Sequence, residues 1–182
     1  MKKNVLQEKY TSEVVPKLLK ELGCKNVMAV PKITKVTINV GLSRAANNAS
    51  FKEDVIRDLR IITGQKPVLN KARKAIAGFK IREGQEIGAS VTLRGRRMWD
   101  FLGKLVGAAI PRIKDFQGIE RKNFDEQGNL NFGFKEQLTF PEISTDEIST
   151  TFGLQVNVTS SANGRDEGIK LFKLLGFPIQ EK

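Results

Sequence analysis

The chain has 182 residues, 40% of them hydrophobic and 28% charged, a composition that fits a globular protein with one substantial core and excludes a disordered one. Its formal net charge of +11 indicates a polyanionic partner, and nucleic acid is the partner that this charge favours. The chain contains no His, which excludes Ser-His-Asp triads, Cys-His pairs and zinc sites that need His.

The N-terminus and the cysteine content bear on the cellular compartment. The opening sequence MKKNVLQEKYTSEVV has basic residues but no apolar core, so we expect no export signal. No apolar run approaches the roughly 20 residues that a membrane span needs. A single Cys24 cannot form an internal disulfide, and we expect it to be a small, at least half-buried residue. These features predict a cytoplasmic protein.

The first predicted elements are a helix over residues 4–23 and a strand over residues 31–41. Apolar residues recur at helical spacing as far as Gly23, and Pro16 should restrict the helix or bend it near residues 11–12. The strand alternates between two faces. Its apolar residues are Val36, Ile38 and Val40, and its polar residues are Lys35, Thr37 and Asn39.

The middle of the chain is predicted to hold one helix and three strands. The helix covers residues 47–63, and the strands cover residues 66–69, 79–82 and 87–94. A basic loop of small residues, 70–78, joins the first two strands. The third strand is expected to direct Ile87, Ala89, Val91 and Leu93 to the core and Gly88, Ser90, Thr92 and Arg94 outward.

Residues 64–97 carry most of the positive charge. Nine Lys or Arg stand there against two acids, Glu83 and Glu86, and the stretch contains no His, Cys or Asp. It is poorly equipped for acid–base or metal chemistry and is typical of a phosphate-binding surface. Its start, Gly64-Gln65-Lys66-Pro67, lacks the spacing of a nucleotide-binding phosphate loop, so nucleotide hydrolysis is not indicated.

A third helix and a hairpin follow. The helix covers residues 96–109 and is expected to end at Pro111. Trp99 borders its apolar stripe, and an aromatic at such a position is more often part of a core than a base-stacking platform. Residues 119–124 and 130–134 are predicted to form the two arms of the hairpin.

Residues 136–164 form an acidic segment without Lys or Arg. Its acids are Glu136, Glu142, Asp146 and Glu147. Three of them can be imagined as ligands of Mg²⁺, but a solvated helix start after residues 144–145 is the more common arrangement. A last strand over residues 154–159 and a last helix over residues 162–175 complete the chain.

These elements predict an α+β fold in a single domain, residues 1–182, with an inserted hairpin. We expect a mostly antiparallel sheet with helices packed on one face and an open, polar second face. That open face lacks the exposed aromatics with which some RNA-binding sheets stack unpaired bases, and it suits a sugar–phosphate surface instead. Asn39, Gln65 and Thr92 can read 2′-hydroxyls or base edges there, or they can be merely solvated side chains.

The stretch ITGQKPVLNKARKAIAGFKIREGQEIGASVTLRGRRMWDFL, with IPRIKDFQGI, NFDEQGNLNFGFKEQLTFPEI and LLGFP, closely resembles a known family. It is the universal family of large-subunit ribosomal proteins that bind 5S rRNA (the L-five family), in its bacterial form. The resemblance covers residues 10–178. It implies a structural RNA-binding protein of the ribosome, not an enzyme, without a cofactor, that helps attach 5S rRNA in the central protuberance.

The resemblance also implies three contact surfaces. The residues implied to bind 5S rRNA are Asn39, Gln65 and Thr92, supported by Lys35 and Arg94. Those implied to contact the P-site tRNA from a basic loop are Lys71, Arg73, Lys74 and Lys80. Those implied to bridge to a small-subunit head protein are Arg112, Glu142, Asp146 and Glu147.

Two other functions stay open at this point. One is a free RNA chaperone or regulator that binds many RNAs through charge alone, and such a protein would not need Asn39, Gln65 and Thr92. The other is a nucleic-acid enzyme, which would need Mg²⁺-dependent turnover that depends on Glu142.

Overall fold

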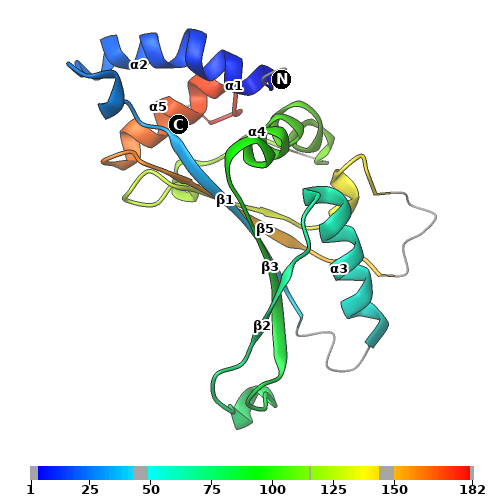
Figure 1. Ribbon diagram of the computed structural model, residues 1–182. Helices are drawn as coiled ribbons and strands as arrows, with labels where there is room; N and C mark the ends of the chain where they lie inside the picture. The colour runs from blue at the N-terminus through cyan, green and yellow to red at the C-terminus, as the bar shows by residue number, and fades with distance from the viewer. Residues whose placement is uncertain (1–3, 43–48, 115, 144–149, 181–182) are drawn as a thin grey trace. The chain divides into compact units, whose positions relative to one another are not determined.

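The computed structural model describes residues 4–42, 49–114, 116–143 and 150–180 (Figure 1). This part of the chain is an α+β fold with a five-stranded antiparallel sheet, in which the strands lie in the order β2-β3-β1-β5-β4. The strands are β1 Ile33–Gly41, β2 Val68–Lys71, β3 Glu86–Leu93, β4 Leu130–Phe134 and β5 Leu154–Ser160. The predicted fold class is confirmed.

The alternation predicted for two strands is confirmed by their burial. In β1 the apolar residues Val36, Ile38 and Val40 are buried, whereas Lys35 and Thr37 are half-buried and Asn39 is exposed. In β5 the buried residues are Leu154, Val156 and Val158, and polar residues alternate with them. Each strand therefore has an apolar face for the core and a polar face outside it.

The helices are α1 Val5–Lys9, α2 Val15–Glu21, α3 Ala49–Thr63, α4 Gly95–Lys104 and α5 Arg165–Leu175. A π-helical segment, Tyr10–Val14, joins α1 to α2, and a second one, Leu105–Ala109, follows α4. A proline, Pro16 or Pro111, stands two residues after each. Because proline has no N–H, the carbonyl four residues earlier loses its helical partner, and a widened turn is a common local solution.

The effect predicted for one proline is present, and the effect predicted for the other is not. The distortion predicted near residues 11–12 is present as the segment Tyr10–Val14. Pro111, in contrast, does not end its helix, because the chain continues through a 3-10 turn, Ile110–Arg112. Proline is tolerated at the start of the new 3-10 segment, because its fixed φ suits the first turn of a helix.

Contacts within the chain divide it into two compact units. Unit 1 comprises Met1–Val36, Leu93–Phe132 and Val156–Lys182, and unit 2 comprises Thr37–Thr92 and Gly133–Gln155. The long strands therefore contribute residues to both units. That the whole chain behaves as a single domain stays a prediction, and an unfolding experiment that tests it is described below.

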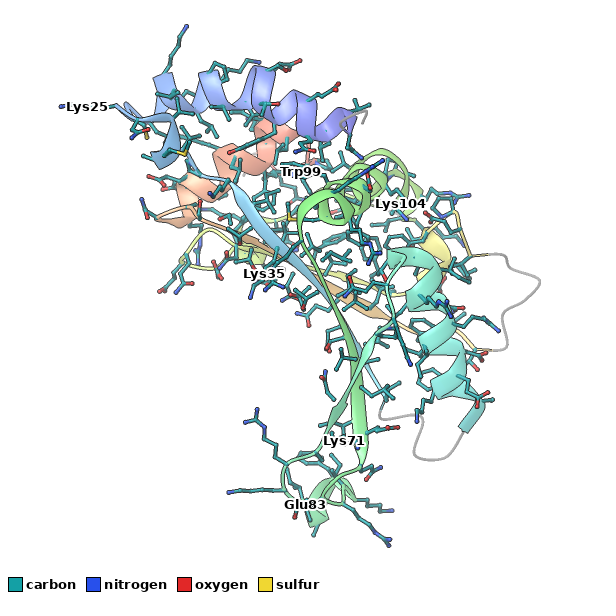
Figure 2. The ribbon with its side chains drawn as sticks, in the orientation of Figure 1. Lys25, Lys35, Lys71, Glu83, Trp99 and Lys104 are labelled. Carbon is teal, nitrogen blue, oxygen red and sulfur yellow. The ribbon has the colours of Figure 1, made fainter. Side chains whose placement is uncertain are left out.

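Unit 1 is built from α1, α2, α4 and α5 around an aromatic core. The rings of Tyr10 and Trp99 have centroids 5.4 Å apart, and the Tyr10 hydroxyl donates to the carbonyl of Pro31 at 3.0 Å. Burial raises the pKa of the Tyr10 hydroxyl. Trp99 is only 7% exposed, so its predicted place in the core is confirmed (Figure 2). Cys24 is half-buried, as expected.

Unit 2 packs α3 onto the apolar face of its strands and closes that core with a buried glutamine. The Gln137 side chain is fully buried; its Nε2 donates to the carbonyl of Thr150 at 3.0 Å, and its Oε1 accepts from the N–H of Phe152 at 2.9 Å. Asp58 of α3 is 2% exposed and contacts Arg57 at 3.2 Å. Burial raises the pKa of the Asp58 carboxyl, although its contact with Arg57 opposes the shift.

One core residue was wrongly predicted, because β3 contains a bulge. In the β2–β3 pair Asn70 faces Gly88 and Lys71 faces Glu86, so Ile87 is an extra residue in the ladder. A bulge interrupts the alternation of side chains. As a result Ile87 is 39% exposed, Gly88, which was expected to face outward, is buried, and the Glu86 carboxylate forms an ion pair with Lys52 of α3.

Two predicted strands are replaced by short turns. Residues 79–82 do not form a strand: the chain makes a 3-10 turn, Ala77–Phe79, and Lys80 has a positive φ of 55° that an extended strand does not allow. Residues 119–124 form a hairpin arm only at their last residue, where Phe124 pairs antiparallel with Leu130. Before it the chain makes a 3-10 turn, Arg121–Asn123, and the N–H of Ile119 donates to the carbonyl of Pro178 at 2.8 Å. β4 pairs with β5 instead.

Candidate nucleic-acid interface

The C-terminal end of α3 positions Gln65 against β3. Gly64, with a φ of 65°, ends the helix, and the buried hydroxyl of Thr63 accepts from the N–H of Gln65 at 3.2 Å. The same hydroxyl donates to the carbonyl of Leu59 at 2.6 Å. Held in this way, the half-buried Gln65 donates from Nε2 to the carbonyl of Thr92 at 3.4 Å. The structure therefore brings two of the predicted RNA-binding residues together.

Asn39 lies beside a glycine on the same sheet. A Cβ atom added to Gly88 would lie 3.7 Å from Nδ2 of Asn70 and 3.9 Å from Oδ1 of Asn39, so these two amides flank the glycine. The Asn70 amide in turn donates to the hydroxyl of Ser90 at 3.2 Å. We call this set of polar residues of unit 2 the amide surface. It consists of Asn39, Gln65, Asn70, Gly88, Ser90 and Thr92.

Asn70 was missed from the sequence because it was counted as part of the basic loop. It belongs to β2, and its pairing with Gly88 places its side chain on the amide surface. No local signal marks Asn70 as part of the strand, because it follows the apolar pair Val68-Leu69 without the alternation of a half-buried strand. The two predicted supporting cations belong to unit 1 and are therefore not part of the amide surface. Lys35 is half-buried on β1, and Arg94 is exposed before α4.

The basic loop forms the tip of the β2–β3 hairpin, which we define as residues 71–84 and call the hairpin tip (Figure 1). Its cations are Lys71, Arg73, Lys74, Lys80 and Arg82, and all five are exposed. Figure 2 shows Lys71 and Glu83 at this end of the hairpin. The structure therefore gathers the predicted tRNA-contacting residues on one projection of unit 2, where their charges face solvent.

The backbone of the hairpin tip is held by its own hydrogen bonds. The N–H of Ala72 donates to the carbonyl of Gln85 at 2.8 Å, and the N–H of Gly84 donates to the carbonyl of Ala72 at 2.9 Å. Further out, Ile76 and Ile81 exchange two bonds of 2.9 and 3.2 Å. The tip is thus a narrow, closed hairpin and not an irregular loop.

The predicted bridging residues do not form one cluster within either unit. Arg112 is exposed at the end of the 3-10 turn in unit 1, and Glu142 is exposed in unit 2. Asp146 and Glu147 lie outside the described residues, as does the helix start expected after residues 144–145. Among the residues that the structure describes, no three His, Cys, Asp or Glu side chains are grouped to hold a metal ion.

The helices agree with the lack of long apolar runs in the sequence. Within the described ranges, none of them is long and apolar enough to cross a membrane.

Two family models match the chain. The model described as "Ribosomal protein L5" matches residues 26–82, and a second model, which describes the C-terminus of the same ribosomal family, matches residues 86–179. The first match contains Asn39, Gln65 and Asn70, and the second contains Gly88, Ser90 and Thr92. The amide surface therefore combines residues from both matched regions.

Similar proteins match almost the whole chain. "Large ribosomal subunit protein uL5" of Streptococcus thermophilus is 49% identical over 176 residues, which are 97% of this chain and 98% of that protein. The protein of the same name from Cupriavidus necator is 50% identical over 175 residues, 96% of this chain and 97% of that protein. That of Halothermothrix orenii is 45% identical over 178 residues, 98% of this chain and 99% of that protein. Since these matches run through both compact units, the chain belongs to the ribosomal protein L5 family.

Proposed function

We propose that the chain, which is a structural constituent of the large ribosomal subunit, binds 5S rRNA in the central protuberance through the amide surface. Its relatives are large-subunit proteins by name, and membership of the family supports a structural, non-enzymatic role on the ribosome. The observation that carries the 5S rRNA proposal is the contact of the Gln65 amide with the backbone of Thr92, which joins the end of α3 to the polar face of β3.

The amide surface suits RNA because its side chains are short, neutral and able both to donate and to accept hydrogen bonds. Asn39 is exposed, and Gln65 and Thr92 keep part of their surface accessible. Such groups recognise 2′-hydroxyls and base edges, whereas cations mainly attract phosphates. Gly88 is buried, and because it has no side chain the amides of Asn39 and Asn70 can lie close to the strand on either side of it.

The first test asks whether the protein, mixed with total RNA in moderate salt, selectively retains 5S rRNA. The second test measures the affinity of 5S rRNA for variants of the protein. Asn39→Ala combined with Thr92→Ala should lower the affinity for 5S rRNA by about 1–3 kcal/mol at fixed salt. A matched control is Asn163→Ala with Thr151→Ala, two exposed residues away from the amide surface. Unchanged affinity in the first variant would falsify the proposal and favour binding through charge alone, as in an RNA chaperone.

The hairpin tip is proposed to contact the P-site tRNA. Its exposed Lys71, Arg73, Lys74 and Lys80 supply positive charge on a narrow projection, which supports a phosphate contact outside the 5S rRNA surface. Replacing Lys71, Arg73 and Lys74 together should impair tRNA-dependent steps of translation more than 5S rRNA binding. If 5S rRNA binding collapses instead, the two surfaces have been assigned to the wrong RNAs.

The bridge to a small-subunit head protein is proposed to use Arg112 and the acidic segment with Glu142, Asp146 and Glu147. An acidic surface on an otherwise basic protein attracts a basic protein and repels rRNA. Neutral substitutions at the three acids should weaken association of the subunits, measured by sedimentation, and leave 5S rRNA binding unchanged. Equal loss of both would contradict this proposal.

A further inference from the structure

Phe79 is an aromatic residue with no place in a core. All Phe, Tyr and Trp residues of the chain lie in the described ranges, and among them Phe79 is the only one in the exposed class, at 76%. It lies in the turn Ala77–Phe79 at the hairpin tip, where Ile76 is also 47% exposed. The other aromatic residues are buried or half-buried, so an exposed Phe79 beside an exposed Ile76 indicates a surface that binds a partner.

The hairpin tip does not need these two side chains to hold its shape. The N–H of Phe79 donates to the carbonyl of Ile76 at 3.3 Å, and the N–H of Lys80 donates to the carbonyl of Ala77 at 3.1 Å. With the two bonds between Ile76 and Ile81, the turn is closed by backbone groups. The Phe79 ring is therefore presented to solvent on an ordered support, and its replacement should leave the fold intact.

The charge around Phe79 indicates the chemistry of that partner. Within the hairpin tip, five Lys or Arg stand against one acid, Glu83. Exposed aromatic rings among cations are typical of surfaces that bind nucleic acid, because a base stacks on the ring while the cations hold the neighbouring phosphates. A protein partner that bound the apolar ring would also need acidic residues to balance the five cations around it.

We propose that Phe79, with Ile76 in the same turn, is a stacking platform for the exposed face of a nucleobase in the RNA that the hairpin tip binds. This inference rests on the proposed RNA contact of the tip and deepens it. The tip then recognises an unpaired or terminal base flanked by phosphates, whereas cations alone would bind any duplex. It also separates the tip from the amide surface, which contains no aromatic residue.

The test uses the full chain and two synthetic RNA hairpins with 2-aminopurine, placed in the loop of one and inside the stem of the other. Stacking quenches 2-aminopurine fluorescence, so the wild-type protein should quench the loop probe. Phe79→Ala should abolish that quenching and lower the affinity for the loop probe about tenfold, while the stem probe and the salt slope stay unchanged. Phe79→Trp should retain both signals. Val68→Ala, at a 64% exposed residue of β2, is the matched control.

A second variant separates failure of this inference from failure of the proposed contact. Lys74→Ala should weaken binding of both probes and reduce the salt slope by about one. If Lys74→Ala does so and Phe79→Ala changes nothing, the stacking platform is wrong and the phosphate contact stands. If neither variant changes binding, the tip does not touch RNA and both proposals for it fail. If Phe79→Ala weakens only the binding of a ribosomal protein, the partner of the ring is protein and the inference is overturned.

Discussion

The amide surface and the hairpin tip belong to the same compact unit but are built on different principles. The side chains of the amide surface are neutral, and hydrogen bonds to α3 and between strands hold several of them in place. The tip carries exposed cations on a narrow hairpin that is closed by its own backbone hydrogen bonds and by one bond from the Arg82 N–H to the Gln85 side chain. We therefore infer that the two surfaces would contribute differently to RNA binding. In the proposed function the cations of the tip attract RNA by charge, whereas the fixed neutral groups of the amide surface select 5S rRNA.

The largest expected effect comes from removing charge at the tip. Lys71→Ala, Arg73→Ala and Lys74→Ala together should lower the affinity for a nonspecific RNA duplex about a hundredfold at 0.1 M salt and reduce the salt slope by roughly two to three. Filter binding across a salt series measures both. The control replaces three exposed lysines of unit 1, Lys17, Lys20 and Lys25, with Ala. An equal loss in the control would mean that total charge, and not the tip, attracts RNA.

The next effect concerns the support of the amide surface. Thr63→Val keeps the volume of the side chain but removes the hydroxyl that accepts from Gln65, so the free energy of unfolding should fall by about 1–2 kcal/mol. Affinity for 5S rRNA should fall as well, because Gln65 is no longer held, and binding of RNA by the tip should not change. Urea denaturation and filter binding measure these effects. Thr11→Val, at an exposed helical threonine, should cost much less.

The amide surface could be foreseen in part from the sequence. The alternation in β1 predicts the exposed Asn39, and the glycine stop after α3 predicts where Gln65 emerges, because both depend on residues close in the chain. The bulge at Ile87 depends on how β2 pairs with β3, and no local pattern encodes that pairing. The place of Asn70 on the amide surface depends on the same register of β2 and β3, so the sequence does not predict it either.

The tip and the buried Gln137 show a second limit of the sequence. Phe79 was expected within a strand, and only the turn Ala77–Phe79 with the left-handed Lys80 reveals that its ring is exposed. Gln137 lies within the acidic segment 136–164, yet its amide is fully buried against the backbone around Thr150 and Phe152. The exposure of Phe79 follows from a local turn that replaces the expected strand, whereas the burial of Gln137 depends on tertiary contacts.

A smaller effect should follow from adding a methyl group at Gly88. The Cβ of Gly88→Ala would lie 3.4 Å from the carbonyl of Val40, an ordinary contact, and the backbone there needs no positive φ. Stability should therefore change little, whereas affinity for 5S rRNA should fall by about 1 kcal/mol, because the new methyl group contacts the amides of Asn39 and Asn70 and shifts them. Gly41→Ala, on β1 with open space around it, is the matched control. Unchanged affinity would mean that RNA does not depend on the exact positions of these amides.

The smallest effect is a pH dependence that also tests whether both units unfold together. The Asp58 pKa is raised from 3.8, so its contribution to stability is present below that value and is lost as pH rises through the folded pKa. Relative to Asp58→Asn, the wild type should thus become more stable as pH falls toward 4. Asp58 lies in unit 2, whereas Trp99, the single tryptophan, lies in unit 1. In a single domain, the urea midpoint that Trp99 fluorescence reports should show this difference, because one cooperative transition transmits it. If the urea midpoint reported by Trp99 fluorescence is the same for the wild type and Asp58→Asn at each pH, unit 1 unfolds by itself. The residues that support the amide surface in unit 2 would then be independent of the stability of unit 1.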